Sequence, residues 1–263
     1  MSQPAAPAPA AAPAAQNNGR NMLAVASGKG GVGKTWFAIS LAHALAKRNV
    51  KTLLFDGDLG LANLDIQLGL MPKRDLGGVV AGRLTLNQAV VPFEEGGFDI
   101  IAGRSGSGSL ANIPLSRLRA LGEDLTLLGV AYDKVIIDLG AGLERTVRQL
   151  THSVNTCLVI ATDDPASLTD AYAFIKVTHM EQPDMDIRIV INMAGSIRAG
   201  ERTYNTLLKA CEGFLKISPP LTGIIRNDSS IREAIRNQSP LLTRYPNCEA
   251  AGDVQAIAAK LLE

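Results

Sequence analysis

A glycine-rich stretch near the start of the chain carries residues suited to binding phosphate. Residues 28–35, GKGGVGKT, match the pattern G-x-x-x-x-G-K-[ST] at every fixed position. Glycines let the backbone wrap a phosphate chain, and successive amides with the following helix N-terminus supply positive potential. Lys34 would neutralise the β- and γ-phosphates, and the Thr35 hydroxyl would ligate Mg²⁺. The stretch predicts a nucleoside triphosphate site rather than a plain glycine-rich turn. Its expected contacts are Gly28, Gly30, Gly31, Val32, Gly33, Lys34, Thr35 and Trp36.

Apolar segments that are typical of buried strands alternate with helical ones along the chain. The alternation predicts an α/β fold with a mainly parallel, twisted sheet and helices on both faces. The expected strands cover residues 22–26, 51–55, 98–102, 134–137, 155–161, 187–191 and 221–225. The expected helices cover 35–48, a short piece within 59–70, 115–129, a helix from about 143, then 167–180, 202–215, 229–237 and 248–262.

The first twenty residues differ in composition from the rest. Residues 4–15 contain only Ala and Pro, and repeated proline prevents helix continuation. The segment lacks the basic start and leucine-rich stretch of a secretory signal. We expect a disordered tail over residues 1–20 and one domain over 21–263.

Composition bounds the classes of function. A net charge of +1 excludes the chain as a general polyanion binder, although residues 188–244 carry nine Lys/Arg against four Asp/Glu. Ordinary solvated helix faces are the favoured explanation of that local excess. The three cysteines are widely spaced and suggest neither disulfides nor a zinc site, so a reducing cytoplasm is expected.

Polar residues follow several of the expected strands. Asp56 and Asp58 follow the second strand, Asp138 follows 134–137, and Asn192 follows 187–191. The carboxyl ends of parallel strands meet at one edge of a sheet, so these side chains are expected to form one composite site with the glycine-rich loop. Asp138 is placed to support a magnesium ion, with a helix cap as the alternative.

Three motifs together resemble the deviant Walker A ATPases of the MinD/ParA class. They are KGGVGKT at 29–35, FDGDLGLANLDIQLGL at 55–70 and IIDLGAG at 136–142, and the resemblance covers residues 22–260. Within that class the chain is similar to the flagellar-number regulators FlhG and FleN. This likeness rests on DLGLANLD at 58–65, GRSGSGSL at 103–110, GAG at 140–142 and DDPASLTDAYAFIK at 163–176.

The resemblance implies a P-loop NTPase that binds ATP or ADP with Mg²⁺ and forms a homodimer when ATP is bound. By the same resemblance Lys29 would reach the partner's phosphates, although from its position alone it is a solvated loop lysine. The implied roles of the remaining residues are water positioning by Asp58, support of Mg²⁺ by Asp56 and Asp138, and contact with the base by Asn192, Arg226 and Asp228.

Two positions depart from the class. Trp36 follows Thr35 on a helix face shared with the polar residues Ser40 and His43. Packing is favoured for it over a partner contact. The last helix has the stripe Val254, Ile257 and Leu261 with a single lysine, which favours docking on the core over lipid anchoring and argues against membrane binding.

The leading hypothesis is a cytoplasmic ATP-dependent switch that slowly hydrolyses ATP and controls the position or number of a cellular structure, most of all flagella. A protein partner would stimulate hydrolysis or be positioned, with recruitment to a pole, the nucleoid or a membrane surface left open. The alternatives are a ParA-like ATPase that contacts DNA non-specifically, and a MinD-like division-site regulator. A metal-cluster carrier is disfavoured because no cysteine lies near the switch motifs.

Overall fold

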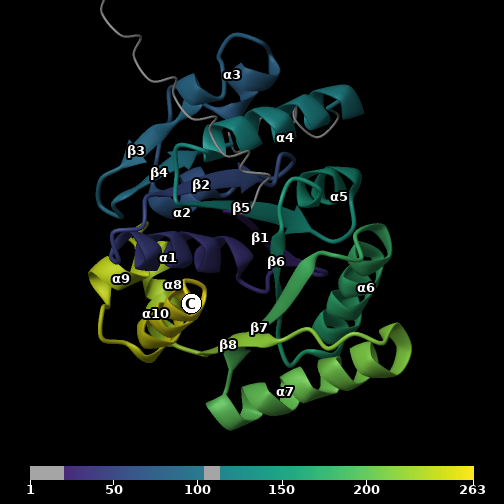
Figure 1. Ribbon diagram of the computed structural model, residues 1–263. Coiled ribbons are helices and arrows are strands. Elements are labelled where there is room, and N and C mark those ends of the chain that lie inside the picture. Colours follow the sequence, from purple (N-terminus) through teal and green to yellow (C-terminus); the bar gives the residue numbers. More distant parts are fainter. Residues whose placement is uncertain (1–20, 104–112) are drawn as a thin grey trace, which may run out of the picture.

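The computed structural model describes residues 21–103 and 113–263 (Figure 1). Residues 1–20 and most of the segment 103–110 lie outside the described residues, so the predicted tail and the GRSGSGSL likeness stay predictions.

The described chain is built on one eight-stranded sheet in the order β3-β4-β2-β5-β1-β6-β7-β8. All neighbouring strands are parallel except β3, which pairs antiparallel with β4 at one edge. The strands are β1 (Met22–Ser27), β2 (Thr52–Gly57), β3 (Val91–Phe93), β4 (Phe98–Ile101), β5 (Lys134–Ala141), β6 (Thr156–Ala161), β7 (Asp186–Ala194) and β8 (Leu221–Arg226). The predicted mainly parallel sheet is confirmed.

Alternate residues of each central strand enter separate hydrophobic cores on the two faces of the sheet. In β1, Met22, Ala24 and Ala26 belong to one core, and Leu23 and Val25 belong to the other. Successive side chains of a strand point to opposite faces, so a strand buried on both sides is a continuous apolar run. This is why the strands could be located from apolar runs alone.

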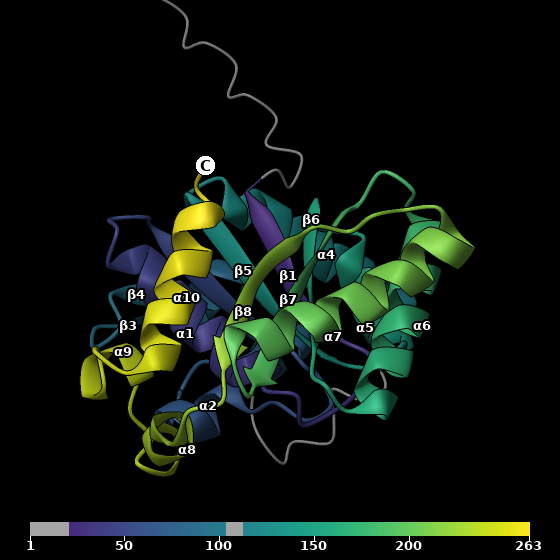
Figure 2. The same cartoon turned by 90° about the horizontal axis from the view of Figure 1, so that it is seen from below.

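Helices cover both faces, as predicted (Figures 1 and 2). One core takes side chains from α3 (Leu76–Val80), α4 (Leu115–Gly129), α5 (Arg145–Thr151), α6 (Pro165–Glu181) and α7 (Ile197–Ala210). The other takes side chains from α1 (Lys34–Ala46), α2 (Leu64–Leu68), α8 (Ser229–Arg236), α9 (Leu241–Arg244) and α10 (Glu249–Lys260). A 3₁₀ turn, η1 (Asn87–Ala89), and a π-helical turn, η2 (Cys211–Leu215), complete the elements.

Several short elements were not predicted from the sequence. β3 has three residues and contains Pro92, which lacks a backbone donor and is tolerated on an edge strand. α3, η1 and α9 have five, three and four residues, so no helical period develops in them. The predicted start of α7 at residue 202 is wrong. The helix begins at Ile197, because the Ser196 hydroxyl accepts the Ala199 N–H at 3.1 Å and caps it.

The last helix is docked on the core. α10 packs against α1 and β8, and its residues Val254 and Ile257 are buried. The expected apolar stripe of the last helix is therefore packed against the protein's own core. Among the described residues no helix is both long and apolar enough to cross a membrane.

Candidate functional site

The glycine-rich loop joins β1 to α1 at the carboxyl edge of the sheet, as the sequence predicts. Gly33 is the N-cap of α1 with φ of 89°, a left-handed conformation that favours glycine. A Cβ on Gly33 would lie 2.5 Å from Asn192 Nδ2, and one on Gly28 would lie 2.0 Å from the Asp170 backbone oxygen. Close packing around the loop thus requires both glycines, and the left-handed turn is a second reason for glycine at position 33.

Three hydrogen bonds fix the shape of the loop. The buried Asn192 donates from Nδ2 to the Val32 carbonyl at 2.8 Å. The Ser27 hydroxyl donates to the Lys29 carbonyl at 2.7 Å, and the Gly142 N–H donates to the Ser27 carbonyl at 2.9 Å. The loop is therefore held by Asn192 in β7 and by Gly142 after β5, and the second contact connects it to the motif IIDLGAG.

Asn192 was expected to follow its strand, but it lies inside β7, which continues to Ala194. Asp138 likewise lies inside β5 and not at its end. In both cases the strand continues past the apolar run because the backbone pairing with its neighbours persists beyond it.

Lys34 and Asp138 are buried charged groups at the centre of the site. Burial lowers the pKa of Lys34, against the opposing effect of the Asp138 and Asp58 carboxylates. Burial raises the pKa of Asp138 to about 7, while the Thr35 hydroxyl and the Lys34 charge act in the opposite direction. The structure thus brings together the three residues Lys34, Thr35 and Asp138.

Asp138 Oδ1 is buried without a hydrogen-bond partner among the described residues. A buried carboxylate oxygen left unpaired is costly, and a metal ion or a water bound to a metal ion would satisfy it. The described residues contain no group of three or more His, Cys, Asp or Glu side chains arranged for a metal. The Thr35 hydroxyl and the Asp138 carboxylate are few but suitable donors for Mg²⁺, which retains several waters and takes ligands from substrate phosphates rather than from an all-protein cage.

Asp56 and Asp58 differ in their surroundings. Asp56 was expected to follow its strand, but it lies buried inside β2, whose pairing with β5 continues to Gly57. Its carboxylate accepts the N–H of Asp58 at 3.2 Å and that of Gly103 at 3.4 Å. Burial, followed by the nearby Asp138 carboxylate, raises its pKa well above the usual value. Asp58 accepts the Leu61 N–H at 2.9 Å, and a Cβ on Gly140 would lie 3.4 Å from its carboxyl carbon. Asp56 therefore braces the loop after β2, and Asp58 lies beside the end of β5.

Lys29 forms an ion pair with Asp164, and both side chains are partly exposed. Lys29 is a partly solvated loop lysine, as its position alone suggests, and the ion pair with Asp164 is an addition to that interpretation. Asp164 also caps α6 by accepting the Ala166 N–H at 3.1 Å, and it precedes Pro165 at the first position of the helix. Asp before Pro is a helix-start signal that could have drawn attention to Asp164, but no sequence pattern pairs it with Lys29.

Arg226 and Asp228 hold the C-terminal helices. Arg226 ends β8 and donates to Asp253 from Nε at 3.0 Å and from Nη2 at 2.8 Å, and it also pairs with Glu249. Asp228 caps α8 through the Ser230 N–H at 2.9 Å, and its other oxygen accepts the Ala250 N–H at 3.3 Å. These contacts position the loop after β8, and the contact of both residues with a base stays a prediction.

Trp36 is packed in the core, with 5% of its surface exposed. The favoured packing interpretation is confirmed. The idea that it lies on a polar helix face is wrong, because Ser40 and His43 are buried as well, and burial lowers the pKa of His43 to about 4.

Residues 23–241 match the CobQ/CobB/MinD/ParA nucleotide-binding domain. The chain belongs to that family. It is 33% identical over 240 residues to the antiactivator FleN of Pseudomonas aeruginosa, covering 91% of this chain and 85% of that protein. It is 30% identical over 243 residues to the flagellum site-determining protein YlxH of Helicobacter pylori, covering 91% of this chain and 81% of that protein.

The fold supports the same assignment. The cell division ATPase MinD of Pyrococcus furiosus superposes with a TM-score of 0.78 at 26% identity, over 93% of this chain and 98% of that one. This MinD/ParA-family chain is thus an ATPase with a P-loop NTPase fold, and the resemblance drawn from the motifs is confirmed.

Asp138 should give the stability of this MinD/ParA-family ATPase a measurable pH dependence. Its pKa is raised from 3.8 to about 7, so between these values the folded chain holds a proton that the unfolded chain has lost. The contribution of Asp138 to the free energy of unfolding therefore falls as pH rises through this window. Asp138→Asn removes this decline. In urea unfolding with EDTA, the free energy of unfolding of the variant, relative to that of the wild type, should therefore be higher at about pH 8 than at about pH 5. The same relative free energy of unfolding at both pH values would contradict the raised pKa.

Asn192→Ala should loosen the phosphate-binding loop. It removes the hydrogen bond to the Val32 carbonyl and is expected to lower the free energy of unfolding by about 1–3 kcal/mol. Binding of ATP and of inorganic tripolyphosphate, measured by calorimetry, should weaken by the same factor, because the change acts on the loop. Asn237→Ala, at the exposed end of α8, is the matched control. Loss of ATP binding with tripolyphosphate binding unchanged would show instead that Asn192 acts through the base.

Proposed function

We propose that the chain is an ATP-dependent dimerising switch whose slow hydrolysis of ATP controls the number or position of flagella. The observation that carries the proposal is the placement of Lys29 and Lys34 on one loop, beside Asp58 and Asp138, at the carboxyl edge of the sheet. The flagellar assignment is supported by the names of the two relatives that are 33% and 30% identical.

The buried end of the loop would bind the phosphates and Mg²⁺. Lys34 already lies in the field of two carboxylates and would meet the β- and γ-phosphates. Thr35 and Asp138 would hold Mg²⁺, Asp138 through a water, with Asp56 supporting the same shell. When bound, Mg²⁺ neutralises phosphate charge. The surrounding backbone amides of Gly28, Gly30, Gly31, Val32, Gly33 and Trp36 would complete the cradle.

Lys29 would make the association state depend on the nucleotide. In the free chain its ammonium is neutralised by Asp164, and a partly exposed ion pair contributes little to stability. A γ-phosphate across a dimer interface offers greater negative charge than one carboxylate. Lys29 would therefore exchange Asp164 for the partner's phosphates when ATP is bound and return to Asp164 after hydrolysis.

Asp58 would orient the attacking water. Its carboxylate is held by the Leu61 N–H and lies next to Gly140, where a side chain would approach it closely. One carboxylate without an added cation at the transition state is a weak catalyst, so hydrolysis by the chain alone would be slow. A stimulating protein partner then sets the lifetime of the dimer.

The base would lie over Asn192, whose Oδ1 is buried without a hydrogen-bond partner among the described residues. An adenine amino group could donate to this oxygen. Arg226 and Asp228 would border the base from the loop after β8.

DNA binding has weaker support. Part of the basic excess over residues 188–244 is neutralised within the chain, since Arg188 pairs with Asp186 at 2.8 Å and Arg226 with Asp253 at 2.8 Å. Phosphate contacts need free cations, so we place the flagellar switch first.

Lys29→Ala should separate nucleotide binding from dimerisation. The variant keeps Lys34 and Thr35 and should bind ATP with near wild-type affinity by calorimetry. In analytical ultracentrifugation with ATP and Mg²⁺ it should remain monomeric where the wild type dimerises. Lys209→Ala on the exposed face of α7 is the control and should dimerise. A Lys29→Ala dimer of wild-type affinity would remove the intermolecular role of this lysine.

Asp58→Ala should trap the ATP dimer. Loss of water positioning is expected to slow hydrolysis by about 10²-fold while the dimer persists. Cells that carry Asp58→Ala in place of the wild-type gene should show a changed number or position of flagella by electron microscopy. Asp184→Ala, an exposed carboxylate distant in sequence, is the control. A biochemically trapped dimer with normal flagella would refute the flagellar role and leave the switch intact, whereas normal hydrolysis would refute the role of Asp58.

A further inference from the structure

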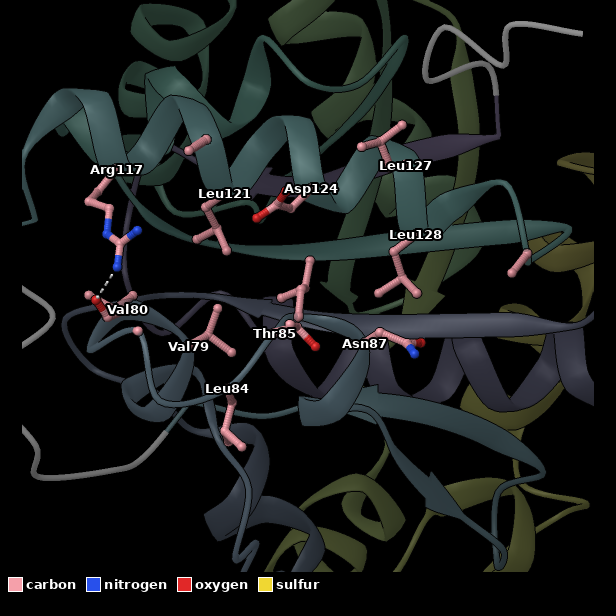
Figure 3. Close-up of a pocket in the computed structure, with 14 residues that line it drawn as sticks. Val79, Val80, Leu84, Thr85, Asn87, Arg117, Leu121, Asp124, Leu127 and Leu128 are labelled. Carbon is pink, nitrogen blue, oxygen red and sulfur yellow. Dashed lines mark hydrogen bonds between the residues drawn. The ribbon is translucent and has the colours of Figure 1, made fainter. Parts of the chain in front are cut away.

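An apolar groove of about 570 Å³ lies between α4 and the segment formed by α3 and η1, away from the phosphate-binding loop (Figure 3). One wall is the exposed side of α4, and the other comes from the end of α3 and the residues that follow it. The aliphatic residues that line the groove include Val79, Val80, Leu84, Leu121, Leu127 and Leu128.

The walls are aliphatic, and polar groups stand at intervals along them. Arg117 closes one end by donating to the Val80 carbonyl at 3.1 Å. Asp124 and Asn87 also line the groove and offer side-chain hydrogen-bond acceptors. Leu127 is 73% exposed, which is a large apolar surface for one side chain to leave in water. The groove suits an uncharged chain with small apolar side chains and free backbone N–H groups.

The described chain begins beside one end of this groove. The Asn21 side chain donates to the Gly129 and Tyr132 carbonyls, each at 2.8 Å, and its own carbonyl accepts the Val135 N–H at 3.0 Å. Residue 21 is thereby fixed at the C-terminal end of α4. Leu128 and Ala131 line the groove at that same end.

The twenty residues that precede Asn21 are long enough to fill the groove. The wall formed by α4 and the turn after it runs from Arg117 to Ala131, which at the helical rise is about 21 Å. The twelve Ala and Pro residues at 4–15 span about 37 Å as a polyproline II helix, so about seven of them cover the wall. The polar residues 16–20 remain as a connector from the groove to Asn21.

We propose that the Ala/Pro segment 4–15 of the chain docks in this groove as a polyproline II strand that runs in the same direction as α4. Alanine methyls and proline rings pack against the aliphatic walls, and alanine N–H groups donate to Asp124 and Asn87. Proline restricts the free segment to this conformation, so docking costs little conformational entropy. The groove is thus an intramolecular docking site, and its occupant covers the exposed surface of Leu127.

Paramagnetic relaxation in the full chain without nucleotide tests the proposal. Cys248 is replaced by Ser, the buried Cys157 and Cys211 are kept, and a nitroxide is attached through Ala10→Cys. With isotope-labelled Leu and Val methyl groups, we expect loss of peak intensity for Leu84, Leu127 and Leu128. Leu207 on α7 should keep its intensity.

Matched variants on α4 give the control. Leu127→Asp places a charge in the groove and should restore the intensities of Leu84 and Leu128. Val130→Asp changes an exposed residue of the same helix end that does not line the groove, and should leave the losses in place. Losses unaffected by Leu127→Asp, or equal weak losses over the whole chain, would overturn the proposal.

A mixture distinguishes docking within one chain from docking between copies. Nitroxide-labelled chain without isotopes is mixed with isotope-labelled chain without nitroxide. Unchanged intensities at Leu84 and Leu128 support intramolecular docking. Losses in the mixture equal to those in the doubly labelled chain would show that the groove takes a segment of a second copy, and would overturn it.

Discussion

The site depends on one costly arrangement, the burial of the Lys34 ammonium together with the Asp138 carboxylate at the edge of a parallel sheet. Neither charge would be tolerated alone at that depth, and each shifts the pKa of the other toward its charged form against the effect of burial. The rest of the site holds these charges in place. Asn192 fixes the loop that carries Lys34, and the end of β5 that follows Asp138 is tied to Ser27.

Close packing makes the loop rigid in a way that phosphate binding alone would not require. Gly28 lies against the backbone of α6, and Gly33 lies against the Asn192 side chain. A methyl group at either position would displace a backbone or a buried amide. The loop is therefore a shared boundary of β1, β7 and α6, three elements that lie far apart in the sequence.

The fold could be predicted because its signals are local. Apolar runs with alternate residues in two cores locate the central strands, and the spacing of Gly28, Lys34 and Thr35 identifies the loop. The pairing of Lys29 with Asp164 and of Arg226 with Asp253 could not be predicted, because each joins segments brought together only by the tertiary fold. The packing of Trp36 was expected, but the polar character of its helix face was predicted wrongly for a related reason. Ser40 and His43 made its helix face look polar, but α1 packs on both the sheet and α10 and is buried nearly all round.

The two lysines of the loop differ in what they would lose by moving. Lys34 is buried among carboxylates, and separating it from them would leave uncompensated charge inside the protein. Lys29 is about two-fifths exposed and pairs with an aspartate that water also solvates, so it can leave that partner at little cost. In the proposed switch, Lys34 would retain the nucleotide and Lys29 would respond to its presence. The burial of the two side chains, rather than their shared charge, is the difference that suits them to these two proposed roles.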